Sequence, residues 1–316
     1  MLITGATGFV GSALCNRLEE SAALRIAVRG PIDAALRGRC EVAHATLDPA
    51  QDWSRALDGI ATVIHCAARV HVMNDDAADP LREFRRINVD GTLQLARQAA
   101  EAGVMRFVFI SSIKVNGEST VPGHPFTAAQ APAPIDPYGV SKWEAEQQLR
   151  KLSAETGMEV VIIRPVLVYG PGVKANFLNM MKWLYKGVPL PLGAIHNKRS
   201  LVALDNLVDL IVTCIDHPRA ANQTFLVSDG EDLSTTELLQ RMSRALGKRP
   251  RLLAVPAWML ETAAKVVGKQ SIAQRLCGSL QVDISHTRER LGWRPPVSVD
   301  AALRKTAQHF LEQQKQ

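Results

Sequence analysis

The chain lacks the features of a membrane-spanning or secreted protein. Among its 316 residues, no apolar run reaches the roughly 20 residues that a membrane-spanning helix needs. The first residues also lack the basic and then apolar pattern of a secretory signal. We therefore expect a cytoplasmic protein that does not insert into a membrane.

Cysteine is scarce, and none of the five cysteines belongs to a CxxC pair. They are dispersed through apolar or mixed stretches, at Cys15, Cys40, Cys66, Cys214 and Cys277. Because the count is odd and zinc sites use closely spaced cysteines, we expect reduced, mostly buried thiols and no metal site.

Aromatic residues make up only 5% of the chain, and its basic residues are dispersed. The 37 basic and 31 acidic side chains leave a net charge of +6. A nucleic-acid-binding surface usually shows clustered basic side chains. We therefore expect no nucleic-acid partner, and we attribute the charge to solubility or to the attraction of small anions.

What the chain does contain is a regular alternation of short apolar runs with helical patterns. The runs lie at residues 1–4, 24–28, 40–45, 61–68, 106–112 and 158–165, with helical patterns between them, as at 52–59 and 81–103. Strands that alternate with helices form parallel sheets through right-handed βαβ units. The sequence predicts an α/β protein with a doubly wound parallel sheet of the Rossmann type.

Three glycines, Gly5, Gly8 and Gly11, follow the first run and lead into a helix that begins with Phe9 and Val10. Glycines at such a turn let the backbone approach a pyrophosphate, whose charge is favoured at the helix N-terminus. The spacing is GxxGxxG, and its place between a strand and a helix predicts a dinucleotide site.

The end of the second strand carries no carboxylate that could bind the ribose 2′-hydroxyl of NAD. Arg29 stands there instead. A guanidinium suits the 2′-phosphate of NADP(H), which we favour as cofactor, with NAD(H) as the alternative. A solvent-facing arginine is the plain alternative for Arg29.

The pattern changes after Pro165. Residues 166–198 are rich in glycine and proline and predict loops around one helix near 175–186. Residues 204–217 predict a helix, 223–229 a strand that returns to the sheet, and helical patterns dominate from about 230. We predict a dinucleotide-binding domain at 1–170 plus about 199–228. A smaller, mainly helical substrate lobe would span about 171–198 plus 229–316.

Only three tyrosines are present, and Tyr138 stands four residues before Lys142. Asp136 and Pro137 precede it as a helix N-cap and first helical residue, so Tyr138 and Lys142 should share one helix face. A nearby ammonium, together with an oxidised nicotinamide, favours the phenolate and would bring its pKa toward neutrality. Such a phenol can exchange a proton with a sugar oxygen.

The segments GATGFVG, VIHCAA, INVDGT, FISSIKVNG, YGVSK and IIRPVLVYGPG follow one another in this order. With them the chain resembles the extended short-chain dehydrogenase/reductase family, and within it the nucleotide-sugar epimerases, dehydratases and 4-ketoreductases. The resemblance covers nearly the whole chain, because the carboxyl-terminal LGWRPPVSVDAALRKT also fits.

The resemblance implies a role for each matching residue. Tyr138 would be the catalytic acid and base, Lys142 would lower its pKa and bind the nicotinamide ribose, and Ser112 would bond the reacting oxygen. Asn88 would support the active site, unless it only bonds its neighbours within a helix. The residues that would line the cofactor are Cys66, Ala67, Ala68, Pro165 and Val168.

The resemblance leaves the reaction open. Dehydratases of the group carry an acid and a base where this chain has Ile113 and Lys114, which disfavours dehydration. Arg29 favours a 4-ketoreductase. The segments SSIKVNGE, DPYGVSKWEAE and VYGPGVKANF also resemble those of proteins that reduce a UDP-4-keto-6-deoxy-N-acetylhexosamine for surface polysaccharide, which implies that substrate. The alternatives are a 4-epimerase of UDP-glucose or UDP-GlcNAc and, more distantly, a non-catalytic NADP-binding sensor. Asn116 replaces a tyrosine that is usual in the family, and the sequence gives no account of it.

The resemblance also implies a UDP-sugar site and an assembly. Asn176, Arg199 and the more weakly matched Arg275 would bind the sugar nucleotide, and residues 188–193 could lie along the uracil ring. A homodimer is usual in the family, and helices near 85–103 and 137–157 would form its contact.

Overall fold

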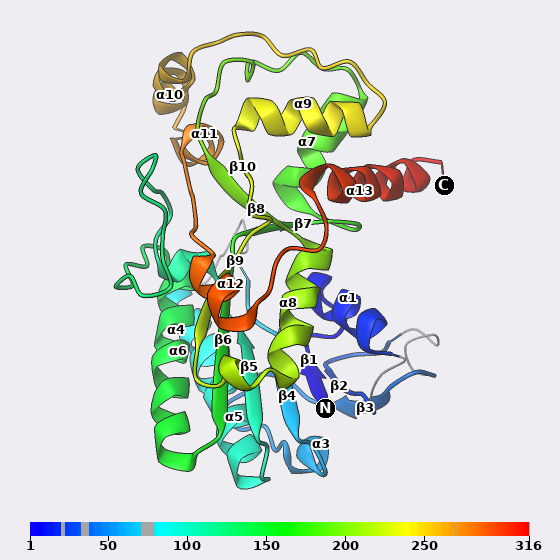
Figure 1. Cartoon of the computed structure of the whole chain (residues 1–316), viewed down its shortest axis with the longest axis vertical. Helices are drawn as coiled ribbons and strands as arrows, with labels where there is room; N and C mark the ends of the chain where they lie inside the picture. Colours follow the sequence, from blue (N-terminus) through cyan, green and yellow to red (C-terminus); the bar gives the residue numbers. More distant parts are fainter. Residues whose placement is uncertain (20–22, 33–37, 71–78, 269, 316) are drawn as a thin grey trace.

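A computed structural model describes residues 1–19, 23–32, 38–70, 79–268 and 270–315. Its centre is a seven-stranded parallel sheet in the order β3-β2-β1-β4-β5-β6-β9 (Figure 1). The strands are β1 (Leu2–Thr4), β2 (Arg25–Val28), β3 (Glu41–His44), β4 (Thr62–His65), β5 (Arg106–Ile110), β6 (Glu159–Pro165) and β9 (Thr224–Val227). The predicted doubly wound sheet is confirmed, and the strand order reverses beside β1, where such sheets bind nucleotides.

Helices cover both faces of this sheet. One face carries α1 (Phe9–Leu18) and α8 (Leu204–Asp216). The other carries α3 (Ser54–Leu57), α5 (Thr92–Glu101) and α6 (Pro137–Thr156). A short helix α4 (Pro80–Arg85) and a π-helix η1 (Arg86–Gly91) precede α5, and α6 packs against both.

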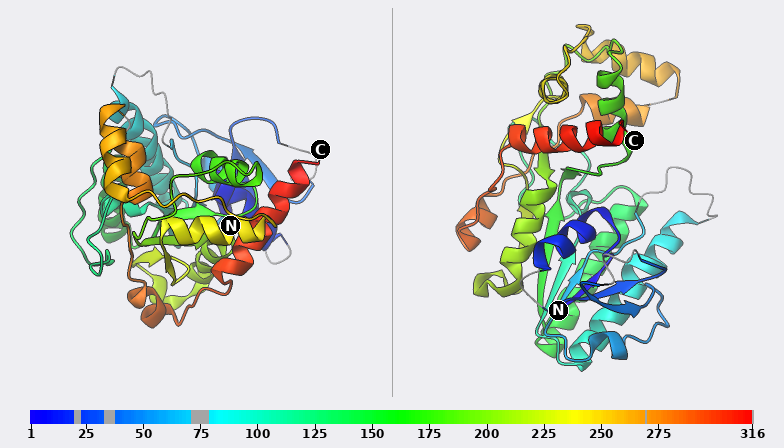
Figure 2. Two further views of the ribbon diagram at one scale, coloured as in Figure 1. Left: turned by 90° about the horizontal axis from the view of Figure 1, so that it is seen from above. Right: turned by 90° about the vertical axis from the view of Figure 1, so that its right-hand side faces the viewer.

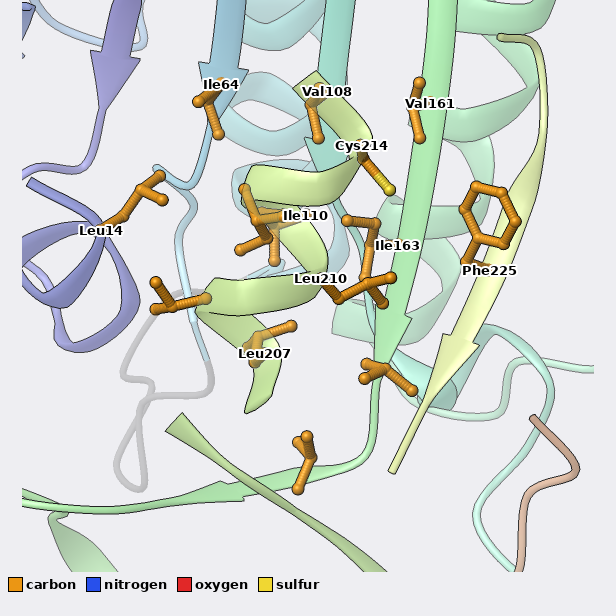
Figure 3. Packing of buried hydrophobic residues seen from close by; sticks show 14 of the residues in the cluster. Leu14, Ile64, Val108, Ile110, Val161, Ile163, Leu207, Leu210, Cys214 and Phe225 are labelled. Atoms are coloured by element: carbon orange, nitrogen blue, oxygen red, sulfur yellow. The ribbon is translucent and has the colours of Figure 1, made fainter. Parts of the chain in front are cut away.

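Strand β5 shows how the sequence builds two cores at once. Val108 and Ile110 face α1 and α8, whereas Phe107 and Phe109 face α5 and α6. Successive side chains of a strand point to opposite faces, so a strand buried on both sides is apolar at every position. Figure 3 shows the first of these cores, in which Leu210 of α8 lies among the side chains of β5 and β6.

The smaller lobe lies beyond the carboxyl ends of the strands (Figures 1 and 2). It holds a three-stranded sheet of β7 (Leu167–Tyr169), β8 (Arg199–Ala203) and β10 (Asp232–Leu233). Its helices are α7 (Ala175–Tyr185), α9 (Thr235–Ala245), α10 (Ala257–Val266), α11 (Gln270–Cys277) and α13 (Val299–Gln313). The lobe has its own apolar core, to which α7, α9 and α13 contribute. The expected helical lobe is confirmed, with a small sheet added to it.

The chain passes between the two parts several times. β6 runs directly into β7, and β8 leads straight into α8, which covers the large sheet. β9 then joins the large sheet before β10 returns to the small one. Helix α12 (Ser285–Leu291) packs against β9, and a 3₁₀-turn η3 (Pro218–Ala220) lies next to it. The predicted domain boundaries stay a prediction.

Candidate active site

The glycine turn after β1 fits closely against the loop after β4. Gly5 has φ +71°, and a Cβ there would stand 2.7 Å from the backbone nitrogen of Ala67. A Cβ on Gly11 would stand 2.1 Å from the carbonyl oxygen of Gly5. Larger residues would push the turn and α1 apart, so the glycines hold the helix N-terminus against the strand ends.

Helix α1 begins without a side-chain cap. Its N-cap is Gly8, whose backbone N–H donates to the Gly5 carbonyl at 2.9 Å. The N–H groups of the first turn therefore have no capping side chain, and together with the helix dipole they suit a bound phosphate. The site predicted for a dinucleotide pyrophosphate therefore has a chemically suitable helix N-terminus, and its occupation stays a prediction.

Helix α6 begins at the predicted residue. The Asp136 side chain accepts a hydrogen bond from the Gly139 N–H at 2.6 Å, and Pro137 occupies the first helical position. Asp136 also forms an ion pair with Lys114, which in turn lies 3.1 Å from Glu118. Because Lys114 follows β5 closely, this pair fastens the start of α6 to the end of that strand.

Lys142 is buried one turn further along α6. Its Nζ donates to the Ile110 carbonyl at 2.8 Å and lies 4.4 Å from the centre of the Phe109 ring. Burial lowers the pKa of Lys142 to about 8, an effect that the nearby Cys66 and Glu146 partly offset. The ammonium thus stands at the carboxyl end of β5, near Cys66 in the loop after β4.

Tyr138 is half-buried, and its ring meets that of Phe84 edge-on, with centroids 6.0 Å apart. Burial and the negative charge of Asp136 raise the pKa of the Tyr138 phenol above its usual value. Lys142 instead points its ammonium at Ile110 and Phe109. The chain's own residues therefore do not lower this pKa, and the lowering predicted from the sequence, which also depends on an oxidised nicotinamide, stays a prediction.

Ser112 caps a 3₁₀-turn η2 (Ile113–Val115) at the end of β5, where its hydroxyl accepts from the Lys114 N–H at 3.3 Å. Ile113 packs into the core, and the Lys114 ammonium forms ion pairs with Asp136 and Glu118. Neither side chain is free for acid or base work. The bonds of Lys142 to Ile110 and of Lys114 to Asp136 bring Ser112, Tyr138 and Lys142 to one corner of the sheet.

Asn88 uses its whole amide within the chain. Its Oδ1 accepts from the Arg69 N–H at 2.8 Å, and its Nδ2 donates to the Arg69 carbonyl and to the Ser141 hydroxyl, each at 3.0 Å. Asn88 therefore ties the loop after β4 to α6. Within this loop, burial raises the pKa of the Cys66 thiol to about 12, so the thiol stays protonated.

His65, at the end of β4, is a buried link that the sequence analysis does not predict. Its Nδ1 lies 2.7 Å from the Thr4 hydroxyl, and its Nε2 lies 3.0 Å from that of Thr92. The Thr4 hydroxyl also accepts from the Ala67 N–H at 3.3 Å. Burial, with the positive charge of Lys142, lowers the pKa of His65 to about 3. A neutral imidazole thus links the end of β4 to β1 and α5, and the Thr4 hydroxyl that it contacts also binds the loop after β4.

A second unpredicted group is a buried ion-pair network behind Ser112. Arg164 donates to both carboxylate oxygens of Glu146, at 2.9 and 2.6 Å, and to Asn116 Oδ1 at 2.9 Å. The Ser111 hydroxyl donates to Glu146 at 2.6 Å, and Asn116 Nδ2 donates to the Thr127 carbonyl at 3.0 Å. This network explains Asn116, whose amide fits between a buried guanidinium and a backbone carbonyl.

A sequence signal for this network does exist. Arg164 interrupts an otherwise apolar strand, and buried charges need partners. Glu146 stands four residues after Lys142 on the face of α6 that carries the site.

Arg29 lies where the sequence predicts it. It is exposed and directly follows β2, which pairs with β1 beside the glycine turn. Pro165 ends β6 in a buried position, and Val168 is half-buried in β7. Both lie where the chain passes from the large sheet to the smaller lobe.

Two of the three predicted substrate residues meet in the smaller lobe. Arg199 donates to the carbonyls of Arg275 and Gly278, each at 3.1 Å. Burial and the positive charge of Arg275 lower the pKa of Arg199. The Arg199 guanidinium thus lies against the backbone of Arg275, and a pair of arginines in one part of the lobe suits a diphosphate. Asn176 is exposed near the start of α7, and its part in the substrate site stays a prediction.

Residues 188–193 lie in the same lobe, paired with the segment before α10. The Leu190 N–H donates to the Arg251 carbonyl at 2.9 Å, and the Gly193 N–H donates to the Leu253 carbonyl at 2.8 Å. Part of this backbone is thus already hydrogen-bonded within the chain.

Two surface hollows lie away from these residues. One of about 250 Å³ borders α6, β6 and β9, and one of about 580 Å³ lies at the amino-terminal edge of the large sheet. Neither hollow is lined by a predicted site residue. The candidate site is therefore located by its side chains and not by the volume of a hollow.

The glycine turn after β1, and the helix that carries Tyr138 and Lys142, lie on a parallel sheet whose strand order reverses beside β1. These features together define a class of nucleotide-dependent enzymes. The model of the NAD dependent epimerase/dehydratase family matches residues 1–228, and the chain belongs to this family. The resemblance found in the sequence is thereby confirmed.

Individual relatives agree over the full length. The chain is 51% identical to a UDP-glucose 4-epimerase of Vibrio cholerae, over 99% of this chain and 95% of the relative. Its fold matches the UDP-glucose 4-epimerase of Thermotoga maritima, determined with UDP-glucose, with a TM-score of 0.80, 22% identity and 99% of each chain covered. It also matches a UDP-glucuronic acid 4-epimerase of Bacillus cereus in complex with NAD, with a TM-score of 0.79, 22% identity and 98% and 96% covered.

Proposed function

We propose that the protein is an NAD-dependent UDP-sugar 4-epimerase, with UDP-glucose as the first substrate to test. The observation that carries the proposal is the full-length relation, at 51% identity, to a UDP-glucose 4-epimerase. The clustered Ser112, Tyr138 and Lys142 supply the side chains that such a reaction requires. The 4-ketoreductase, favoured from the sequence, has no direct support among these relatives.

The chain's own residues would move the proton. Tyr138 would take the proton of the sugar C4 hydroxyl and later return it, while Ser112 would hold that oxygen. Lys142 would keep a positive charge beside the site and would bind the ribose hydroxyls. Arg199 and Arg275 would hold the diphosphate, which leaves the sugar free to present either face.

Bound NAD would accept a hydride from the sugar and return it. Gly5, Gly8 and Gly11 would hold its pyrophosphate at the start of α1. The residues Phe9, Val10, Cys66, Ala67, Ala68, Asn88, Pro165 and Val168 remain proposed as its surroundings.

Arg29 is the one observation that favours the ketoreductase. A guanidinium in place of a carboxylate at the end of β2 suits NADPH, which a reductase would consume and release. If Arg29 contacts the 2′-phosphate, Arg29→Asp should shift the preference toward NADH by at least about tenfold.

The deciding experiment incubates the purified protein with UDP-glucose, or with UDP-GlcNAc, without added cofactor. We expect the C4 epimer to form and NAD to be released when the protein is denatured. The proposal fails if neither epimer forms while NADPH is consumed one for one with a UDP-4-keto-6-deoxy sugar, and the ketoreductase would then replace it.

A further inference from the structure

Helix α10 is unusual because it is rich in apolar residues, yet none of them is fully buried. Seven of its ten residues are Ala, Val, Leu, Met or Trp, and none of the ten is buried. A helix of a globular protein normally turns its apolar stripe toward a core. Ala257 and Leu260 pack partly against the core of the smaller lobe, whereas Trp258, Met259 and Val266 are exposed and lack such cover.

Exposed apolar side chains occur on α10 and in the segments next to it in the chain. Trp258 and Val266, eight residues apart on α10, lie on one helix face and are 66% and 81% exposed. α10 packs against α11 at the outer end of the smaller lobe (Figures 1 and 2). We call the exposed apolar residues of this region the hairpin surface: Leu253, Trp258, Met259, Val266, Val267 and Ile272.

The same stretch holds nearly all of the chain's net charge. Residues 248–277 contain six basic residues and one acidic residue, a net charge of +5, whereas the whole chain carries +6. Lys265 is exposed on α10 itself, and Arg251 is exposed before it. Lys248 lies over the ring of Tyr185 in α7 and does not belong to this region. Exposed apolar side chains with the exposed Lys265 on the same helix are complementary to an anionic, partly apolar partner.

We propose that the hairpin surface docks onto the surface of an anionic lipid bilayer, with α10 lying in the headgroup region. Exposed apolar side chains together with basic ones are the signature of a helix at this depth, and tryptophan favours it. Crossing the bilayer is not involved, since no helix in the described ranges is long and apolar enough to span one.

Docking would hold the smaller lobe, and not the large sheet, against the membrane. α11 packs against α10 and carries Arg275, which lies beside Arg199. The proposed diphosphate site would therefore lie close to the lipid surface. The docking itself does not depend on the proposed function, because it needs no substrate.

The test is co-sedimentation of the full chain with vesicles of phosphatidylcholine, with and without phosphatidylglycerol. We expect binding only to the anionic vesicles and release at high salt, because screening weakens the attraction. Trp258→Ala should lower the partition coefficient about tenfold, since it removes a large apolar side chain from the interface. Trp183→Ala is the matched control, because Trp183 is 45% exposed on α7.

A second pair of variants tests the charge. Lys265→Glu should lower the partition coefficient by about an order of magnitude, whereas Lys315→Glu should change it little. Lys315 is exposed just after α13, and the carboxyl-terminal end of the chain lies across the smaller lobe from α10 (Figure 1). Equal binding to both vesicle types, no binding at low salt, or no effect of Trp258→Ala would overturn the proposal. So would a fall in self-association of Trp258→Ala without lipid, because a second copy of the chain would then cover the surface.

Discussion

At the scale of single residues, the hydroxyl of Tyr138 has the most specific proposed task. Tyr138→Phe removes only that oxygen, so fold and cofactor binding should persist while turnover falls about 10²- to 10⁴-fold. Tyr185→Phe is the matched control, because Tyr185 packs edge-on against Phe310 in the smaller lobe. Steady-state epimerisation rates check the pair, and near-normal turnover of Tyr138→Phe would remove the phenol from the mechanism.

His65 makes the fold sensitive to acid. Its pKa is about 3 in the folded chain and about 6.5 when unfolded, so the unfolded state binds the proton more readily. The stabilisation is complete above about pH 6.5 and is lost as the pH falls toward 3. Between about pH 7.5 and about pH 5.5 this residue alone should cost about 1.4 kcal/mol of unfolding free energy.

The measurement is urea unfolding at both pH values for the wild type and for His65→Gln, which keeps a polar group but does not titrate. The variant should be less stable at neutral pH and should lose about 1.4 kcal/mol less on acidification. Equal losses in the two proteins would mean that His65 does not contribute to the acid sensitivity.

At the scale of elements, α6 is held from behind by Glu146. The carboxylate joins α6 to Ser111 after β5 and to Arg164 in β6. Glu146→Gln would leave Arg164 buried with a neutral partner, which should destabilise the fold by about 3–5 kcal/mol.

Glu155→Gln is the control on the same helix, because the Glu155 carboxylate is exposed and 3.9 Å from Lys151. Its effect should stay within about 0.5 kcal/mol. Thermal and denaturant unfolding check both variants, and similar losses in the two would argue against a special role for the buried pair.

The elements also show what a sequence can and cannot predict. Strands buried on both faces are continuously apolar, so their places, and the start of α6 at Asp136 and Pro137, follow from local patterns. The bond between Asn116 and Arg164 joins residues 48 positions apart, and no local pattern specifies it. The direction of the Lys142 ammonium likewise depends on the position of β5, which only the packed sheet fixes.

At the scale of the whole molecule, the predicted homodimer remains to be tested. A dimer that forms through α5 and α6 would have a mass of about 69 kDa by sedimentation velocity, twice the 34.5 kDa of one chain. Gln147→Glu with Gln148→Glu places charges on an exposed part of α6, where a two-fold contact would bring like charges together.

Sedimentation velocity should then show monomer for this double variant and dimer for the wild type. Gln313→Glu, exposed near the end of α13, should leave the dimer intact. A monomeric wild type, or a double variant that stays dimeric, would contradict a contact through these helices.

The repeated passage between the two parts has a consequence for synthesis on the ribosome. When about 200 residues have emerged, six of the seven strands of the large sheet exist, but α8 and β9 do not. The sheet face that Leu207 and Leu210 later cover would stay open to water until these elements emerge. A nascent chain of that length should therefore be a ready client for chaperones, and release from them should follow the emergence of α8 and β9.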